Sequence, residues 1–212
     1  MKVRVGVVDS GINPDHPHVG GIAGGVNCHP DGDSTDFIDR IGHGTAVAGA
    51  IREKAPEAEL YAVRIFERRL SANIETLLQG LEWCLDHAMN IVNVSVGTAN
   101  PHHRDRLEDL VRRARERDIF VVSAASLLPG MIDGAIAVAA DPECDRNRCR
   151  FQDGIFWAAP WPRPIPGVPP ERNLKGVSFA IANCTGLLAR SLESRTPVDA
   201  YEHLLQSTRL VR

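Results

Sequence analysis

The sequence predicts an α/β fold with three layers, in which a mostly parallel central sheet carries helices on both faces. Three observations support this prediction. Short apolar runs recur along the chain, and segments with apolar residues at three- and four-residue steps separate them. The composition is that of a globular protein, because 43% of the 212 residues are hydrophobic and 24% are charged. We therefore expect residues 1–212 to form a single domain.

Apolar runs of strand length mark five expected strands, over residues 3–8, 60–65, 91–96, 119–125 and 135–140. Apolar residues at helical spacing predict helices over residues 74–88 and 107–114. Strands and helices thus alternate, and in such sheets ligands bind outside the carboxyl ends of the strands. Six prolines within residues 156–174 predict a long surface loop, which leads into Ser178.

Charge and hydropathy exclude several kinds of partner. The formal net charge is -3, and the arginines of residues 104–117 alternate with acidic residues as on a solvated helix face, so we expect no nucleic-acid partner. No apolar run approaches the roughly 20 residues of a membrane span, so we expect no membrane partner. Met1-Lys2 leads straight into an apolar stretch without a signal sequence, which predicts a cytoplasmic location. A form trimmed from a secreted precursor would fit the same observation.

The cysteines, histidines and acidic residues complete no metal-binding motif. Cys28-His29, Cys144 and Cys149 are zinc-ligand types, but there is no CxxC pair and no HExxH helix. The four aspartates of residues 31–39 lack the spacing of an EF-hand loop, so we expect them to be solvated. We therefore expect no metal and no other cofactor. Five cysteines, an odd number, favour free thiols, with a local Cys144–Cys149 disulfide as the alternative under oxidising conditions.

Three short segments carry the residue types that a serine hydrolase needs. Asp9 ends the first apolar run, where a sheet would hold its carboxylate rigidly. His43 lies in Gly-His-Gly-Thr-Ala-Val-Ala-Gly, whose small residues let a helix approach its neighbours closely. Ser178 begins an apolar helical run, where backbone N–H groups point at an oxyanion formed nearby. Each segment alone also fits a capping or core role, but together they supply nucleophile, base and orienting carboxylate.

The order Asp, His, Ser and the surrounding sequences resemble the subtilisin-like serine peptidases, the subtilases. The similar blocks are Asp-Ser-Gly-Ile, His-Gly-Thr-Ala-Val-Ala-Gly and Gly-Val-Ser-Phe-Ala, and the resemblance extends over nearly the whole chain. It implies a serine endopeptidase that forms a seryl acyl-enzyme, with Asp9, His43 and Ser178 as its triad. It also implies that Ser95-Val96-Gly97 pairs with the backbone of a peptide or protein substrate and lines the primary pocket.

The chain departs from the family pattern at an expected oxyanion donor. The family has an asparagine after a buried strand, whereas Leu127 stands at the matching position here. A leucine side chain cannot donate, so only the backbone N–H of Ser178 remains of the expected pair. Ser126, one position earlier, would replace the donor if the loop were rebuilt. Around the serine, Val177 replaces the usual threonine and Ala182-Asn183 the usual Pro-His.

These features leave three functions open. The first is an active endopeptidase, and the second is a pseudopeptidase that binds peptides without efficient turnover, for which Leu127 is the reason. The third is a peptidase dedicated to one precursor peptide. Leu127, Leu128 and Val96 predict an apolar primary pocket. The calcium-binding loop of typical family members would lie within residues 50–60, which are too few to surround the ion.

Overall fold

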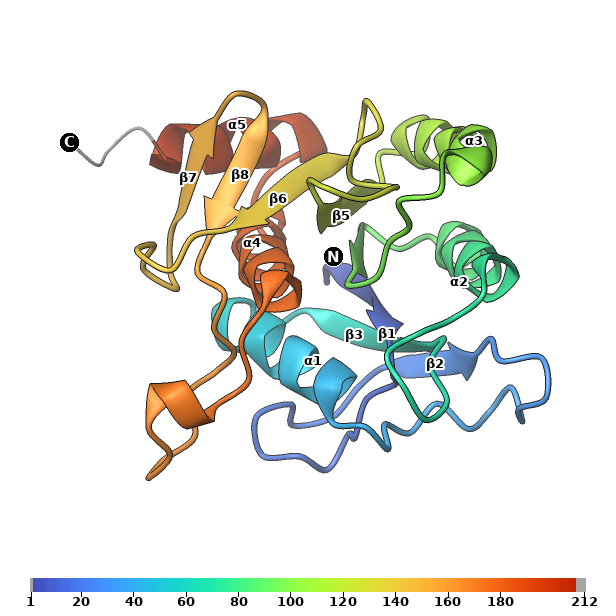
Figure 1. The fold of residues 1–212 in the computed structure, drawn as a ribbon. Helices are drawn as coiled ribbons and strands as arrows, with labels where there is room; N and C mark the ends of the chain where they lie inside the picture. Colours follow the sequence, from blue (N-terminus) through green and yellow to red (C-terminus); the bar gives the residue numbers. More distant parts are fainter. Residues whose placement is uncertain (1, 209–212) are drawn as a thin grey trace.

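The computed structural model describes residues 2–208, and its centre is a sheet in the order β2-β3-β1-β4-β5-β6-β8-β7 (Figure 1). Neighbouring strands run parallel, except that β7 and β8 form an antiparallel pair. This confirms the predicted mostly parallel sheet. The strands are β1 (Arg4–Asp9), β2 (Gly24–Asn27), β3 (Glu59–Arg64), β4 (Ile91–Val94), β5 (Phe120–Ala124), β6 (Ile136–Ala140), β7 (Cys149–Gln152) and β8 (Ile155–Ala158).

Helices cover both faces of this sheet, so the predicted three layers are present (Figure 1). One face packs on α1, α4 and α5, and the other on α2 and α3. Alternate residues of β1 serve the two faces, because Val7 packs in the first core and Val8 in the second. The helices are α1 (His43–Lys54), α2 (Ile74–Asp86), α3 (Arg104–Arg115), α4 (Val177–Leu192) and α5 (Pro197–Thr208), with short 3₁₀ turns η1 (Pro101–His103) and η2 (Pro170–Arg172).

The five strands and two helices predicted from apolar periodicity are all present as β1, β3, β4, β5, β6, α2 and α3. The prediction that residues 156–174 are wholly loop is wrong at their start, because residues 156–158 belong to β8. Phe156 pairs with Val138 of β6 and is 1% exposed, so burial against the sheet fixes this segment as a strand. The elements β2, β7 and α5 were not predicted.

Several local predictions concern the surface and the loops. The arginine-rich segment is α3, and its Arg106 and Arg113 form ion pairs with Glu75 and Glu82 of α2, as expected for a solvated face. Only residues 55–58 separate α1 from β3, which is a short connection. All five cysteines are free thiols. Within residues 2–208, no helix combines the length and apolar character that crossing a bilayer requires.

The sheet brings the carboxyl ends of β1 and β4 to the same rim. Val8 of β1 pairs with Val94 of β4. Asp9, the last residue of β1, and Ser95, the first residue after β4, therefore lie at neighbouring positions. Helices α1 and α4 pack closely beside this rim, since a Cβ added to Gly186 of α4 would lie 3.2 Å from Ile51 Cα of α1. The first turns of the two helices lie close together, because the ring centroids of His43 in α1 and Phe179 in α4 are 5.5 Å apart.

Candidate active site

Asp9 and His43 form a buried pair at this rim. His43 Nδ1 lies 2.8 Å and 2.9 Å from the two carboxylate oxygens of Asp9. The Asp9 side chain is 0% exposed and that of His43 is 14% exposed. Because an ionised carboxylate only accepts hydrogen bonds, Nδ1 carries the hydrogen and Nε2 is the basic atom of the ring.

A glycine allows α1 to begin this close to β1. An ideal Cβ on Gly44 would lie 2.2 Å from the Gly11 carbonyl oxygen and 3.2 Å from Asp9 Oδ1, so any side chain there would push the helix away. Gly42, the residue before the helix, has φ 92°, a left-handed conformation that glycine adopts readily. The Gly44 N–H also donates to Ser10 Oγ at 2.9 Å, which ties the helix to the residue after β1.

Asp39 organises the turn that presents His43, and the sequence prediction missed it. We expected the aspartates of residues 31–39 to be solvated, which is wrong for Asp39. Its two oxygens accept hydrogen bonds from the Ser10 hydroxyl (2.9 Å), the N–H groups of Ile41 and Gly42 (2.8 Å each), and the N–H and hydroxyl of Thr45 (2.9 Å and 2.6 Å). Its place four residues before His43, at the start of a helix, was the available signal.

The surroundings of His43 favour its protonated form. Burial would lower the pKa of His43, but the hydrogen bond and charge of Asp9, with the charge of Asp39, outweigh burial. The pKa of His43 therefore lies above its usual value. Such an imidazole is a stronger base than a free histidine and readily holds a proton passed to it.

Ser178 lies in the first turn of α4, and the residue that follows it, Phe179, packs beside His43. The Phe179 ring lies 5.5 Å from the His43 ring between centroids, which brings the two helix starts together. The Ser178 hydroxyl donates to the Ser95 carbonyl oxygen at 3.5 Å, and in the described part of the chain no hydrogen bond joins it to His43. A rotation about the single side-chain torsion of Ser178 would redirect this hydroxyl.

Ser95-Val96-Gly97 continues β4 beyond the sheet and is held in place by buried residues of β4 and α4. The Asn93 amide donates to Ser95 Oγ at 2.9 Å, and the Thr185 hydroxyl of α4 donates to Asn93 Oδ1 at 3.0 Å. Asn93 and Thr185 are 0% exposed. This buried network fixes Ser95 relative to the helix that carries Ser178.

The segment after Gly97 is joined to the segment after β5. Thr98 and Leu128 exchange two backbone hydrogen bonds of 3.0 Å each. An ideal Cβ on Gly97 would lie 2.7 Å from Leu127 Cβ, so Leu127 packs directly on the Gly97 backbone. The two segments expected to form the walls of a primary pocket are therefore in contact.

Leu127 and Ser126, the residues expected at the oxyanion region, lie on the turn after β5. Leu127 is half-buried, and its backbone N–H donates to the Ala124 carbonyl at 3.2 Å, within the turn that follows β5. Ser126 is exposed on that turn. The N–H of Ser178 lies in the first turn of α4, where helical N–H groups have no carbonyl partner four residues earlier.

Asn183, where the family pattern has histidine, holds the start of the proline-rich loop. Its amide nitrogen donates to the carbonyls of Ala159 (2.8 Å) and Trp161 (3.0 Å), and the residue is 0% exposed. The Gly176 N–H donates to the Pro160 carbonyl at 3.0 Å, so the two ends of the loop are joined directly before Ser178. This departure from the pattern thus has a structural role.

Comparisons with known proteins agree on one family. The model of the subtilase family matches residues 1–139, which include Asp9 and His43. Subtilisin Savinase of Lederbergia lenta is 33% identical over 201 residues, a match that covers 87% of this chain and 71% of Savinase. The alkaline protease of Alkalihalobacillus alcalophilus is also 33% identical over 201 residues, and the match covers 87% of this chain and 50% of that protein.

A relative and a solved structure extend this result. The minor extracellular protease Epr of Bacillus subtilis (strain 168) is 36% identical over 133 residues, which are 58% of this chain and 20% of Epr. The crystal structure of a cold adapted subtilisin-like serine proteinase superposes with a TM-score of 0.74 at 20% identity, covering 96% of this chain and 81% of that one. At this identity the superposition supports the fold alone.

Proposed function

We propose, from the premise that this chain belongs to the subtilase family, that this subtilisin-like serine endopeptidase acts through Asp9, His43 and Ser178. The observation that carries the proposal is the buried Asp9 carboxylate, which orients His43 at the rim. Helix α4 begins at this rim and carries Ser178 in its first turn. We also propose that residues 1–212 act as one peptidase domain.

Hydrolysis would run in two halves. The Ser178 hydroxyl turns from the Ser95 carbonyl and attacks the scissile carbonyl carbon, while His43 Nε2 takes its proton. His43 then gives this proton to the leaving amine, which departs and leaves the acyl group on Ser178. Water attacks the acyl carbon in the second half, again with His43 as base and then acid. Throughout, Asp9 holds the Nδ1 hydrogen and stabilises the imidazolium.

The oxyanion would be stabilised by the Ser178 N–H and the positive end of the α4 dipole. Because Leu127 cannot donate, one donor of the family pattern is missing. Loss of one such donor lowers kcat by about 10²–10³-fold in a serine peptidase. We therefore propose slow turnover, which would suffice for a peptidase dedicated to one precursor peptide.

Substrates would be peptides or proteins that bind in an extended conformation along Ser95-Val96-Gly97. Since Leu127 packs on Gly97, we expect a small apolar residue at the substrate position that supplies the scissile carbonyl. A larger side chain would require Thr98 and Leu128 to separate.

A second candidate function is peptide binding without efficient cleavage. Two observations favour it, the leucine at position 127 and the contact between the walls of the expected pocket. Equal affinity of the wild type and Ser178→Ala for extended peptides, without cleavage products in mass spectrometry, would select this function.

A fluorophosphonate probe tests the proposed chemistry. We expect it to label the wild type on Ser178, as shown by peptide mapping, and to leave Ser178→Ala unlabelled. Ser194→Ala, which removes an exposed serine, is the matched control and keeps the labelling. A folded wild-type protein that acquires no label at Ser178 would refute the proposal.

We retain a cytoplasmic location as a prediction, consistent with the five free thiols. One relative is named as extracellular, so the location is tested directly. Fractionation of the native host with an antibody against this chain should find it in the cytoplasmic fraction, and recovery from the medium would contradict the prediction.

A further inference from the structure

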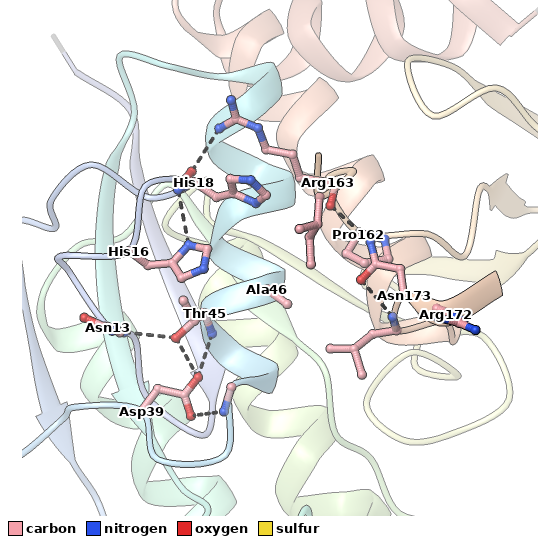
Figure 2. A pocket seen from close by; sticks show the side chains of 13 residues that line it. Asn13, His16, His18, Asp39, Thr45, Ala46, Pro162, Arg163, Arg172 and Asn173 are labelled. Atoms are coloured by element: carbon pink, nitrogen blue, oxygen red, sulfur yellow. Dashed lines mark hydrogen bonds between the residues drawn. The ribbon is translucent and has the colours of Figure 1, made fainter. Parts of the chain in front are cut away.

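A cavity of about 410 Å³ opens beside the first turn of α1 (Figure 2). Its walls come from three segments: the loop after β1, the start of α1 and the proline-rich loop before α4. Gly42 and Leu174 belong to the lining, and they lie one residue before His43 and four residues before Ser178. The cavity therefore adjoins the candidate active site.

Arg163 supplies a positive charge to this cavity from the proline-rich loop. It is partly buried, and its Nη1 donates to the His18 carbonyl at 3.3 Å, across to the loop after β1 (Figure 2). A guanidinium has five N–H donors, so it can hold this carbonyl and still bind a carboxylate. Arg172, an exposed residue of the lining, adds a second positive charge.

His16 adds an imidazole ring to the same cavity. Its Nδ1 accepts the N–H of His18 at 3.2 Å, so in the neutral ring the hydrogen is on Nε2. Burial first, and then the charges of Arg163 and His16, lower the pKa of His18, although Glu53 acts in the opposite direction. Burial, and then the positive charge of Arg163, thus disfavour a cationic His18 at this cavity.

Asp39 is the acidic group of the lining, but its carboxylate is engaged at the start of α1. Both carboxylate oxygens accept hydrogen bonds from backbone and side-chain donors around the α1 start. It also lies at the helix N-terminus, whose dipole stabilises a negative charge. The donors of Arg163 and His16 face the cavity from the other walls (Figure 2).

We propose that this cavity is a subsite for a substrate carboxylate on the side of the scissile bond away from Ser95-Val96-Gly97. The inference rests on the proposed function, because it takes Ser178 as the nucleophile that attacks the scissile bond. Ser178 contacts Ser95. The cavity is lined instead by residues around the start of α1, next to His43, and by the proline-rich loop that precedes Ser178. The carboxylate belongs either to an aspartate or glutamate side chain or to the free carboxyl terminus.

Cleavage of a peptide library with mass-spectrometric readout tests the subsite. We expect aspartate and glutamate, or a free carboxyl terminus, to be enriched about tenfold within the first few positions after the cleaved bond. Arg163→Gln should abolish the enrichment and Arg163→Lys should keep part of it, whereas Arg195→Gln, at an exposed arginine elsewhere, keeps it in full. Peptides amidated at the carboxyl terminus separate the two sources of the carboxylate. Enrichment of neutral or basic residues would overturn the proposal.

Binding to the Ser178→Ala protein separates failure of the subsite from failure of catalysis. N-acetylglutamate should shift the imidazole NMR signals of His16 and His18, with about tenfold tighter binding than N-acetylglutamine amide, which has no carboxylate. Arg163→Gln should remove this difference. Equal binding of the two probes would overturn the subsite, even if the fluorophosphonate labels Ser178. Preferential binding of the anion without fluorophosphonate labelling would instead overturn the proposed chemistry.

Discussion

Replacing Leu127 by asparagine should supply the oxyanion donor that we propose is missing. The side chain lies on the turn after β5, in contact with the Gly97 backbone. An asparagine amide there would donate to the oxyanion that forms beside the Ser178 N–H. Because the donor acts only on the charged intermediate, its effect should appear in kcat rather than in KM.

The size of the effect follows from two opposing contributions. A restored donor raises kcat by up to about 10²–10³-fold. Loss of the half-buried leucine side chain destabilises the fold by about 1–2 kcal/mol, well below the stability of a typical domain. Leu127→Ala is the matched control, since it opens the same contact with Gly97 without adding a donor. The ratio of the asparagine to the alanine variant therefore measures the donor alone.

The assay is the rate of labelling by a fluorophosphonate, whose phosphoryl oxygen mimics the oxyanion and which requires no known substrate. We expect Leu127→Asn to react at least about tenfold faster than Leu127→Ala. Ser178→Ala combined with Leu127→Asn should not react at all. Rates for the two single variants that agree within about threefold would refute the assigned position of Leu127 at the oxyanion.

Three further predictions concern the surroundings of His43. The raised pKa of His43 places the acid limb of kcat/KM at a higher pH than a free histidine would, and Asp9→Asn should move this limb to lower pH while reducing kcat by about 10⁴-fold, as a pH–rate profile would show; an unmoved limb would contradict the pairing. Asp39→Asn should lower kcat more than it raises KM, because the His43 turn loosens, and an unchanged kcat would exclude a positioning role. Gly44→Ala should lower Tm by roughly 3–10 °C in a thermal melt, whereas Gly24→Ala, whose Cβ would meet only Tyr61 at 3.5 Å, should not; equal melts would contradict the close approach.

The centre of the fold was predictable because its strands are buried on both faces and read as continuous apolar runs. The strand β2 reads Gly-Gly-Val-Asn, where a Cβ on Gly25 would lie 2.4 Å from the Ala62 carbonyl, so close packing selected residues that give no strand signal. In β7 only Cys149 is buried, and in α5 only Ala200 and Leu204 are. Elements at the periphery of the fold bury too few residues to give a clear periodicity of apolar residues in the sequence.

The candidate site was predictable where a functional residue lies in a recognisable local motif. Asp9 and His43 carry local motifs, and the structure places them in contact. Asp39 has only its place before a helix as a signal, because its role depends on donors contributed by residues on both sides of the helix start. The pairing of Thr98 with Leu128 joins segments thirty residues apart, which no local pattern reveals.

The same side chain links the two departures of this chain from its family. We propose that Leu127 takes the place of a donor. It also packs on Gly97, where the adjoining Thr98–Leu128 pair satisfies both backbones in the free protein. A substrate strand entering here would exchange those two hydrogen bonds for its own, so the net free energy of opening is small compared with the bonds broken. Entry would then be limited mainly by the side chain that must displace Leu127, which selects small residues. Slow chemistry and narrow selection would therefore arise from one substitution, and Leu127→Ala should broaden cleavage toward larger residues without increasing the fluorophosphonate rate as Leu127→Asn does.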